Sequence, residues 1–191
     1  MSVTLSELEK RCLSCNECPL RQGARQVVFG TGNEKARIMF VGEGPGEQED
    51  IEGEPFVGKS GQLLDKYLEL IDLDRNENIY IANIVKCRPP QNRDPKPEEQ
   101  DVCIKWLREQ VKIIRPRIIV CLGRIAAQRL ISPSFRVTAQ HGQFIEKGGI
   151  LFMGTFHPSA LLRNPSNKPL ALYDFQQLRE KIEEKCLKPE I

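Results

Sequence analysis

Short apolar runs alternate with amphipathic segments along most of the chain. Four runs have no helical stripe and end near glycine or a turn residue, as buried parallel strands do: residues 37–42 (RIMFVG), 78–85 (NIYIANIV), 117–123 (RIIVCLG) and 149–156 (GILFMGTF). Helical spacing marks residues 62–73, 98–115, 123–131 and 170–186. This alternation predicts an α/β fold with one domain over residues 1–191, a central four-stranded parallel sheet and helices on both faces.

Four connecting segments are expected to meet at one end of this sheet. Ligands of such sheets bind beyond the carboxyl ends of the strands, which gathers residues 42–61, 86–97, the turn after Gly123 and residues 157–165. The first segment holds six glycines and two prolines and is predicted to be a loop throughout.

Composition narrows the class of protein without naming a partner. The chain has 191 residues, of which 40% are hydrophobic and 28% charged, and this balance excludes general disorder. No apolar run reaches the roughly 18 residues of a membrane span, and the first residues lack a secretory signal, so we expect a cytoplasmic protein with no membrane partner. The net charge of +2 neither supports nor excludes nucleic acid as a ligand.

Seven cysteines suggest a metal site rather than disulfides, because a reducing compartment disfavours disulfide bonds. Cys121 and Cys186 lie in a strand and a charged helix and are not expected to be ligands. The remaining thiols suit either zinc or an iron–sulfur cluster: Cys12, Cys15, Cys18, Cys87 and Cys103. Cys12 and Cys15 have the same spacing as Cys15 and Cys18, so either pair could supply ligands.

Residues 53–60 (GEPFVGKS) match the phosphate-binding loop of nucleotide hydrolases letter for letter. Such a loop leaves a buried strand directly, whereas an acidic stretch precedes Gly53, and Pro55 removes a backbone N–H group. A nucleotide hydrolase therefore remains as an alternative only.

Several ordered motifs together resemble the iron–sulfur uracil-DNA glycosylases known as family 4. They lie at residues 15–18 (CNEC), 27–30 (VVFG), 42–50 (GEGPGEQED), 55–64 (PFVGKSGQLL), 83–93 (NIVKCRPPQNR), 103, 122–123 and 157–163 (HPSALLR). The resemblance implies a 4Fe-4S cluster held partly by the N-terminal segment, residues 1–26, and leaves Cys12 as the spare thiol. The implied ligands are Cys15, Cys18, Cys87 and Cys103.

The same resemblance implies roles at the strand ends. Phe56 would stack on a flipped uracil, Asn83 would bind O4 and N3–H of the base, and His157 would donate a hydrogen bond to O2. The implied catalytic groups are Asn83, His157 and Glu43. Glu43 would position or activate water or stabilise the sugar cation. Glu49 would exclude the methyl group of thymine, and backbone N–H groups of Gly42 and Gly44 would meet uracil oxygen. For both acids, a solvated loop position remains the alternative.

Contacts to DNA are expected from polar and basic groups at the same rim: Lys59, Ser60, Lys86, Arg88, Arg93, Ser159 and Arg163. Leu161, Leu162 and Arg163 resemble the position from which relatives push a side chain into the base stack.

The implied activity is that of a monofunctional uracil-DNA glycosylase in base excision repair, which leaves an abasic site in an intact backbone. We expect a monomer, and binding to a sliding clamp is left open. A non-enzymatic iron–sulfur protein that binds DNA or carries electrons is the alternative from another class.

Overall fold

The computed structural model describes residues 3–186, which form a six-stranded sheet in the order β1-β3-β2-β4-β6-β5. The four inner strands pair in parallel, and β1 and β5 pair antiparallel at the two edges. The strands are β1 (Thr31–Gly32), β2 (Ile38–Gly42), β3 (Ile79–Asn83), β4 (Ile118–Leu122), β5 (Phe144–Lys147) and β6 (Ile150–Thr155). The predicted four-stranded sheet is thus incomplete: the inner strands match the four apolar runs, and the two edge strands were missed.

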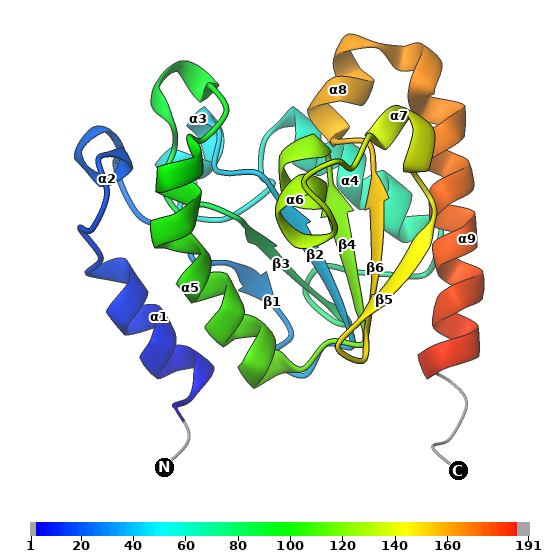
Figure 1. The fold of residues 1–191 in the computed structure, drawn as a ribbon, viewed down its shortest axis with the longest axis horizontal. Coiled ribbons are helices and arrows are strands. Elements are labelled where there is room, and N and C mark those ends of the chain that lie inside the picture. Colours follow the sequence, from blue (N-terminus) through cyan, green and yellow to red (C-terminus); the bar gives the residue numbers. More distant parts are fainter. Residues whose placement is uncertain (1–2, 187–191) are drawn as a thin grey trace.

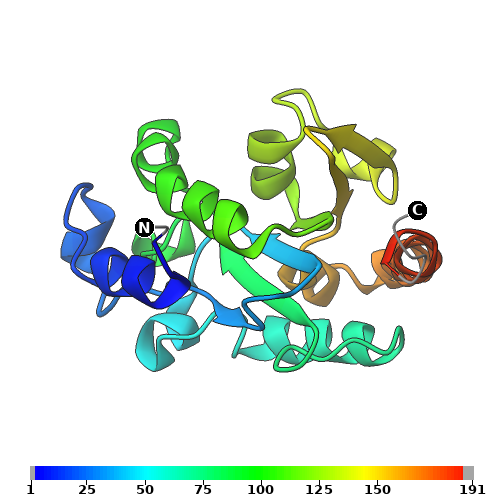
Figure 2. The same cartoon turned by 90° about the horizontal axis from the view of Figure 1, so that it is seen from below.

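Helices cover both faces of the sheet, as Figures 1 and 2 show. The core on one face includes side chains from α1, α5 and α6, and the core on the other includes side chains from α4, α8 and α9. The α-helices are α1 (Leu5–Leu13), α2 (Leu20–Gly23), α3 (Glu47–Glu52), α4 (Lys59–Glu69), α5 (Pro97–Ile114), α6 (Arg124–Leu130), α7 (Val137–Gln140), α8 (Pro158–Arg163) and α9 (Lys168–Cys186). Two short 3-10 helices are η1 (Pro90–Asn92) and η2 (Pro165–Asn167).

The inner strands supply both cores by simple alternation. In β2, Met39 and Val41 pack with α1 and α5, while Ile38 and Phe40 pack with α4 and α9. All five β2 residues are buried. A strand covered on both faces therefore reads as one continuous apolar run, because neither face has to be polar.

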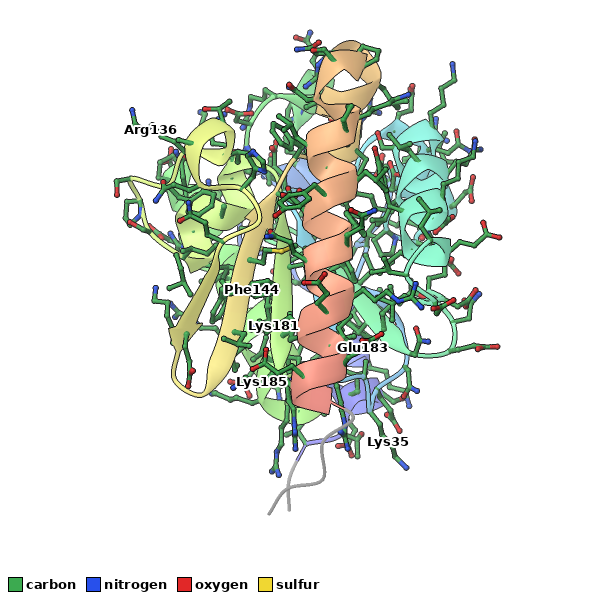
Figure 3. The ribbon with its side chains drawn as sticks, turned by 90° about the vertical axis from the view of Figure 1, so that its right-hand side faces the viewer. Lys35, Arg136, Phe144, Lys181, Glu183 and Lys185 are labelled. Atoms are coloured by element: carbon green, nitrogen blue, oxygen red, sulfur yellow. The ribbon has the colours of Figure 1, made fainter. Side chains whose placement is uncertain are left out.

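Helix α9 runs along the β5–β6 edge of the sheet (Figure 3). Its Phe175 lies between Phe40 and Tyr67, at ring-centroid distances of 6.1 and 5.0 Å. Nearer its end, the Lys181 ammonium lies 5.6 Å from the centre of the Phe144 ring. No helix among residues 3–186 is long and apolar enough to cross a membrane.

The prediction of a loop throughout residues 42–61 is wrong. Helix α3 lies inside this segment, and α4 begins at Lys59, three residues before the predicted start. Three acidic residues occupy the first turn of α3, Glu47, Glu49 and Asp50, where the helix dipole favours negative charge. Gly46 and Gly53 flank this helix as its caps, so these glycines end a helix rather than exclude one.

Candidate active site

A cavity of about 660 Å³ lies beyond the carboxyl ends of the inner strands, and residues of the short helices α3, α7 and α8 are part of its lining. These helices are at the top of Figure 1. All four expected segments contribute to its lining, for example through Glu43, Asp94, Gly123 and His157. The four segments thus meet at one cavity, as the sequence predicted, because the parallel register brings these strand ends together.

Phe56, Asn83 and His157 all line this cavity. The rings of Phe56 and His157 are 5.6 Å apart between centroids and tilted by 33°. Asn83 is the last residue of β3. Gly42 lies between two of these groups, since a Cβ added there would collide with Asn83 Oδ1 and the Phe56 ring. Three segments far apart in the chain thus present an aromatic ring, an amide and an imidazole to one space.

The amide of Asn83 is only 2% exposed, and its Oδ1 has no hydrogen-bond partner. Among residues 3–186, it is the single buried side-chain nitrogen or oxygen atom left without one. A buried acceptor without a donor costs about 1–3 kcal/mol, so native proteins rarely keep one without a reason. An orphaned acceptor that faces a cavity is a position for a ligand donor.

His157 precedes α8 and is held by the first turn of that helix. Its Nδ1 accepts a hydrogen bond from the Ser159 backbone N–H (3.1 Å) and lies 2.7 Å from Ser159 Oγ. Because Nδ1 is an acceptor, the proton of the neutral ring belongs on Nε2. Burial, with a smaller contribution from Arg163, lowers the pKa of His157 to about 4. The imidazole is therefore neutral at pH 7 and presents Nε2–H as its donor.

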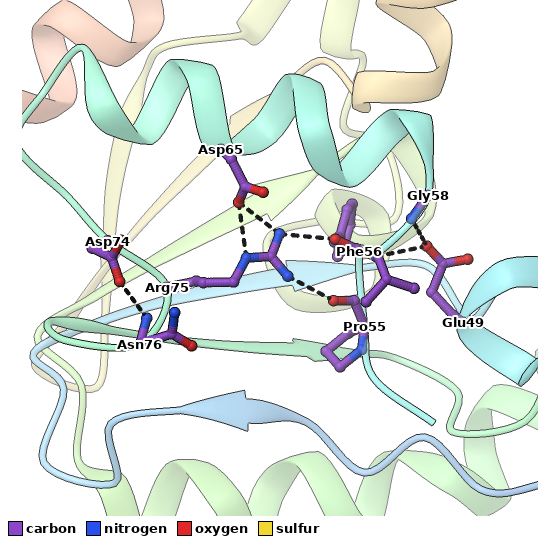
Figure 4. A network of polar contacts seen from close by, with 9 residues as sticks. Glu49, Pro55, Phe56, Gly58, Asp65, Asp74, Arg75 and Asn76 are labelled. Carbon is purple, nitrogen blue, oxygen red and sulfur yellow. Dashed lines mark hydrogen bonds and ion pairs between the residues drawn. The ribbon is translucent and has the colours of Figure 1, made fainter. Parts of the chain in front are cut away.

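Arg75 fixes the backbone that carries the Phe56 ring (Figure 4). Its guanidinium donates to the carbonyl oxygens of Pro55 (3.3 Å) and Phe56 (2.8 Å) and to Asp65 Oδ1 at 2.6 and 2.8 Å. Phe56 has a φ of +56°, a strained value for a residue with a side chain. Gly61 of α4 packs directly against the Phe56 carbonyl, where a Cβ has no room. Sequence reasoning missed Arg75, because it lies in a polar stretch far from the motifs.

Glu43 follows β2 and lines the same cavity. Burial, reinforced by the charge of Asp94, raises the pKa of Glu43 to about 7, although Arg124 and Arg163 oppose the shift. A carboxyl group that titrates near neutral pH suits proton transfer or the positioning of water.

Glu49 also lines the cavity, but its carboxylate already has backbone partners. Oε1 accepts from the N–H groups of Val57 (3.0 Å) and Gly58 (3.1 Å), and Oε2 accepts from that of Gly46 (3.1 Å). The two bonds from Val57 and Gly58 tie α3 to the start of α4, as Figure 4 shows for Gly58, and the bond from Gly46 caps α3 itself. Glu49 therefore has a clear structural task in addition to any contact with a ligand.

Most of the expected DNA contacts lie at the cavity, namely Lys59, Ser60, Arg93, Ser159 and Arg163, together with Gly44. Arg88 is not part of the lining, but it donates to Asn92 Oδ1 (2.9 Å) and lies 3.7 Å from Glu47, and both partners line the cavity. Arg124 was missed by sequence reasoning, which had no motif at that position. It lines the cavity and pairs with Asp94 at 2.5 Å.

Two expectations for DNA contacts are wrong. Lys86 is 1% exposed and bonds Gln110 Oε1 at 2.8 Å, so its ammonium cannot reach a phosphate at the rim. Leu161 is 2% exposed and belongs to the core under α8, so it cannot act as a wedge. Leu162, at 40% exposure, remains available on the same helix.

The four expected ligand thiols and Cys12 line a second, smaller cavity between α1, the start of α5 and the segment after β3. Burial raises the pKa of Cys87 to about 12 and that of Cys103 to about 11, and Cys103 Sγ accepts a hydrogen bond from the Lys86 backbone N–H at 3.2 Å. Within residues 3–186, no three potential ligand side chains are gathered closely enough to hold a single metal ion. Thiolate donors suit zinc or an iron–sulfur cluster in general, so the chemistry of this donor set is compatible with a cluster.

Comparison with known proteins identifies the family. The family model described as Uracil DNA glycosylase superfamily matches residues 29–183. The type-4 uracil-DNA glycosylase of Archaeoglobus fulgidus is 42% identical over 185 residues, covering 93% of this chain and 92% of the relative. The chain belongs to the uracil DNA glycosylase superfamily, and within it to the type-4 enzymes.

Two further type-4 uracil-DNA glycosylases show the same pattern. The relative from Thermotoga maritima is 44% identical over 92% of this chain and 93% of its own length. The relative from Sulfurisphaera tokodaii is 41% identical over 93% of this chain and 84% of its own length. The resemblance read from the motifs is thus confirmed. The phosphate-loop match is not favoured, since α3 and not a strand precedes Gly53.

Proposed function

We propose that this type-4 family member is a monofunctional uracil-DNA glycosylase, which flips uracil out of DNA and hydrolyses its N-glycosidic bond. The observation that carries the proposal is the meeting of Phe56, Asn83 and His157 in one cavity at the strand ends. We also propose that residues 1–191 act as one domain and as a monomer, with residues 1–2 and 187–191 outside the described part of the chain.

Base recognition follows from the donors and acceptors in the cavity. A duplex hides the bond, so the nucleotide must leave the stack, at a cost of a few kcal/mol. The Phe56 ring offers a stacking face, and Asn83 Oδ1 has an unused acceptor site for uracil N3–H. Its amide N–H₂ then faces uracil O4. Cytosine presents an acceptor and a donor in the reverse order, so the same amide disfavours it.

Bond cleavage separates charge, and the cavity has groups for both ends. Negative charge grows on the carbonyl oxygens of the departing uracil, where the Nε2–H of His157 donates a hydrogen bond that strengthens as the charge develops. The backbone N–H groups near Gly42 and Gly44 are proposed to donate hydrogen bonds to a carbonyl oxygen of the departing uracil as well. A neutral imidazole is sufficient for this task, in agreement with its lowered pKa.

Glu43 is proposed to act on the sugar side of the bond. In its ionised form, it orients or activates the attacking water and stabilises positive charge on the sugar. We further propose that Glu49 lies beside uracil C5 and excludes the methyl group of thymine, with its bonds to Gly46, Val57 and Gly58 holding it rigid.

The rim of the cavity is proposed to bind the DNA backbone. Lys59 and Arg163 offer positive charge to the phosphates, and Ser60 offers a neutral hydroxyl. The Ser159 hydroxyl is also a proposed phosphate partner, although it lies within hydrogen-bond distance of His157 Nδ1. Arg88 and Arg93 are proposed to contribute at the outer edge. Arg163 and Leu162 are the exposed groups on α8 that would fill the gap left by the flipped nucleotide.

A 4Fe-4S cluster is proposed in the second cavity, held by Cys15, Cys18, Cys87 and Cys103, with Cys12 as a buried neighbour. Ligation would join the N-terminal segment, the loop after β3 and α5 at one point. When bound, the cluster supplies a cross-link and a centre able to accept or donate an electron. The protein residues around it exclude water and position the sulfurs.

One experiment tests enzyme class and bond together. The purified protein is incubated with an oligonucleotide that carries a single uracil, and the product is treated with alkali. Cleavage at uracil only after alkali indicates an abasic site in an intact backbone. Matched oligonucleotides with thymine or cytosine at the same position should stay whole, and an uncut uracil strand would refute the proposal.

A further inference from the structure

Lys86 is a fully buried lysine beside the cysteine cavity. It is 1% exposed, immediately precedes Cys87 and lines that cavity. Its ammonium donates to Gln110 Oε1 at 2.8 Å and lies 5.8 Å from the centre of the Phe29 ring. No carboxylate of the described residues pairs with it.

Gln110 is held so that its oxygen faces Lys86. Its Nε2 donates to the Phe29 carbonyl oxygen (3.0 Å) and is 3.2 Å from the Tyr80 hydroxyl, and the side chain is fully buried. Flipping the amide would break the bond to the Phe29 carbonyl and turn an N–H₂ group toward the ammonium. The position of the Lys86 charge is therefore set by three separate elements: β3, α5 and the segment before β1.

A buried ammonium with only a neutral amide and a ring face lacks the counter-charge that such groups normally require. The groups available to supply negative charge are the thiols that line the same cavity as Lys86, among them Cys12 and Cys103, and the Cys103 Sγ accepts a hydrogen bond from the Lys86 backbone N–H at 3.2 Å. Protonated thiols carry no charge. Four thiolates bound to a 4Fe-4S core carry a net negative charge, and this charge increases when the cluster takes up an electron.

We propose that Lys86 is the buried counter-charge of the cluster and raises its reduction potential. The proposal rests on the cluster proposed above. A fixed positive charge stabilises the more negative reduced state more than the oxidised state, and burial leaves this attraction little screened by solvent. One electron from the electrode enters the cluster, and no proton transfer is required.

The test is the one-electron reduction potential of the cluster-loaded protein, measured by spectroelectrochemistry for wild type and Lys86→Met. At a fixed electrode potential, the ratio of reduced to oxidised cluster should fall at least tenfold in the variant, which is 59 mV for one electron. Lys105→Met is the matched control. Lys105 is 43% exposed, pairs with Glu17 and lies over Trp106 beside the same cavity, so solvent should hold its effect below twofold.

Gln110→Glu provides a second route if Lys86→Met does not fold or does not keep its cluster. It retains Lys86 and places a carboxylate on its ammonium, so the ratio should fall by more than threefold. A ratio within twofold of wild type in a cluster-loaded Lys86→Met or Gln110→Glu protein would overturn the role of Lys86. Iron and sulfide content are measured first, because a wild-type protein without iron would refute the cluster itself and thereby remove the counter-charge.

Discussion

Asn83 shows how one atom links burial to chemistry at the scale of the residue. Its Oδ1 is buried and unpaired, and the residue belongs to the cavity lining. A group with only a structural task would have found a partner during folding, since an unpaired buried acceptor destabilises the native state. The missing donor is best explained by a ligand that brings one.

The first prediction concerns this amide. Asn83→Ala should lower the single-turnover cleavage of a uracil oligonucleotide by about 10- to 1000-fold, which corresponds to about 1.4–4 kcal/mol of barrier. The free energy of unfolding should not fall by more than about 1 kcal/mol, because the substitution removes an unpaired buried acceptor and breaks no protein hydrogen bond to Oδ1. Asn76→Ala, at an exposed position outside the cavity lining, is the control. Unchanged cleavage in Asn83→Ala would remove the amide from the mechanism.

The second prediction concerns His157. His157→Ala should reduce cleavage over the same range, since it deletes the donor to uracil O2. Its pKa of about 4 keeps the ring neutral at every pH above about 5, so protonation of His157 should not shape the wild-type profile near neutrality. A rate for His157→Ala within twofold of wild type would contradict this role.

The third prediction is the pH dependence that Glu43 imposes. The ionised carboxylate is the active form, so cleavage should rise with pH through about 7 in wild type and stay low and flat in Glu43→Gln. A wild-type profile that falls through this range would instead assign Glu43 the role of an acid.

The same group has a measurable effect on stability. Its pKa is about 7 in the folded protein against an ordinary value of 4.5, so the folded state binds the proton more tightly. The free energy of unfolding therefore falls as pH rises from about 4.5 to 7. At pH 8, Glu43→Gln should be more stable than wild type by about 1–2 kcal/mol, allowing for partial solvent screening. Denaturant titrations at pH 5 and pH 8 provide the comparison.

Side-chain direction is what the sequence could not provide at this scale. Asn83 and His157 were correctly placed at the cavity because parallel strands end together, and Phe56 was correctly placed there on the segment between α3 and α4. Lys86 has an equally suitable position in the chain, but the Val28 N–H binds its carbonyl (2.7 Å) and its side chain turns beneath α5. That orientation depends on contacts with distant segments that no local pattern encodes.

At the scale of the element, the Arg75 guanidinium joins the loop that carries Phe56 to α4 through Asp65. Arg75 is only 15% exposed in its side chain, so these bonds are partly shielded from water. The strained φ of Phe56 persists because these contacts hold the backbone in place.

The fourth prediction follows from that contact. Arg75→Ala should lower the free energy of unfolding by about 1–3 kcal/mol, because two carbonyl oxygens and one carboxylate lose a donor. Its cleavage rate should fall as the Phe56 ring loses its fixed position. A double-mutant cycle with Asp65→Asn separates the ion pair from the carbonyl bonds. If Arg75→Ala cleaves normally while less stable, the clamp serves folding alone.

Elements with a clear periodic pattern of apolar residues were predictable, and short or largely exposed elements were not. The four inner strands and α5 match their patterns to within a few residues. Strand β1 has two residues and β5 is half exposed, so neither produces an apolar run. Helix α3 was hidden by its glycines, which in fact stand at its two caps.

At the scale of the whole molecule, the small net charge of +2 has a local counterpart at the cavity, whose lining holds four acidic residues, Glu43, Glu47, Glu49 and Asp94, and four basic ones, Lys59, Arg93, Arg124 and Arg163. Acidic partners neutralise several of the basic groups: Arg93 bonds Glu99 at 2.7 Å and Arg124 bonds Asp94 at 2.5 Å. Composition alone could not indicate this arrangement, because it averages over the surface.

The fifth prediction uses this rim. Arg163→Ala should weaken binding to DNA and reduce the slope of log K against log salt by about 1, as expected when one phosphate contact is lost. Arg108→Ala, on α5 away from the cavity lining, should leave the slope unchanged. Equal slopes for Arg163→Ala and wild type would place Arg163 off the DNA backbone.

The direct packing of Gly61 against the Phe56 carbonyl couples the position of α4 to that of the Phe56 backbone. With no side chain between them, a displacement of the Phe56 backbone toward α4 also requires a displacement of the helix. The position of the Phe56 backbone therefore depends on the eleven residues of α4 and on the core beneath this helix, as well as on the loop that carries Phe56.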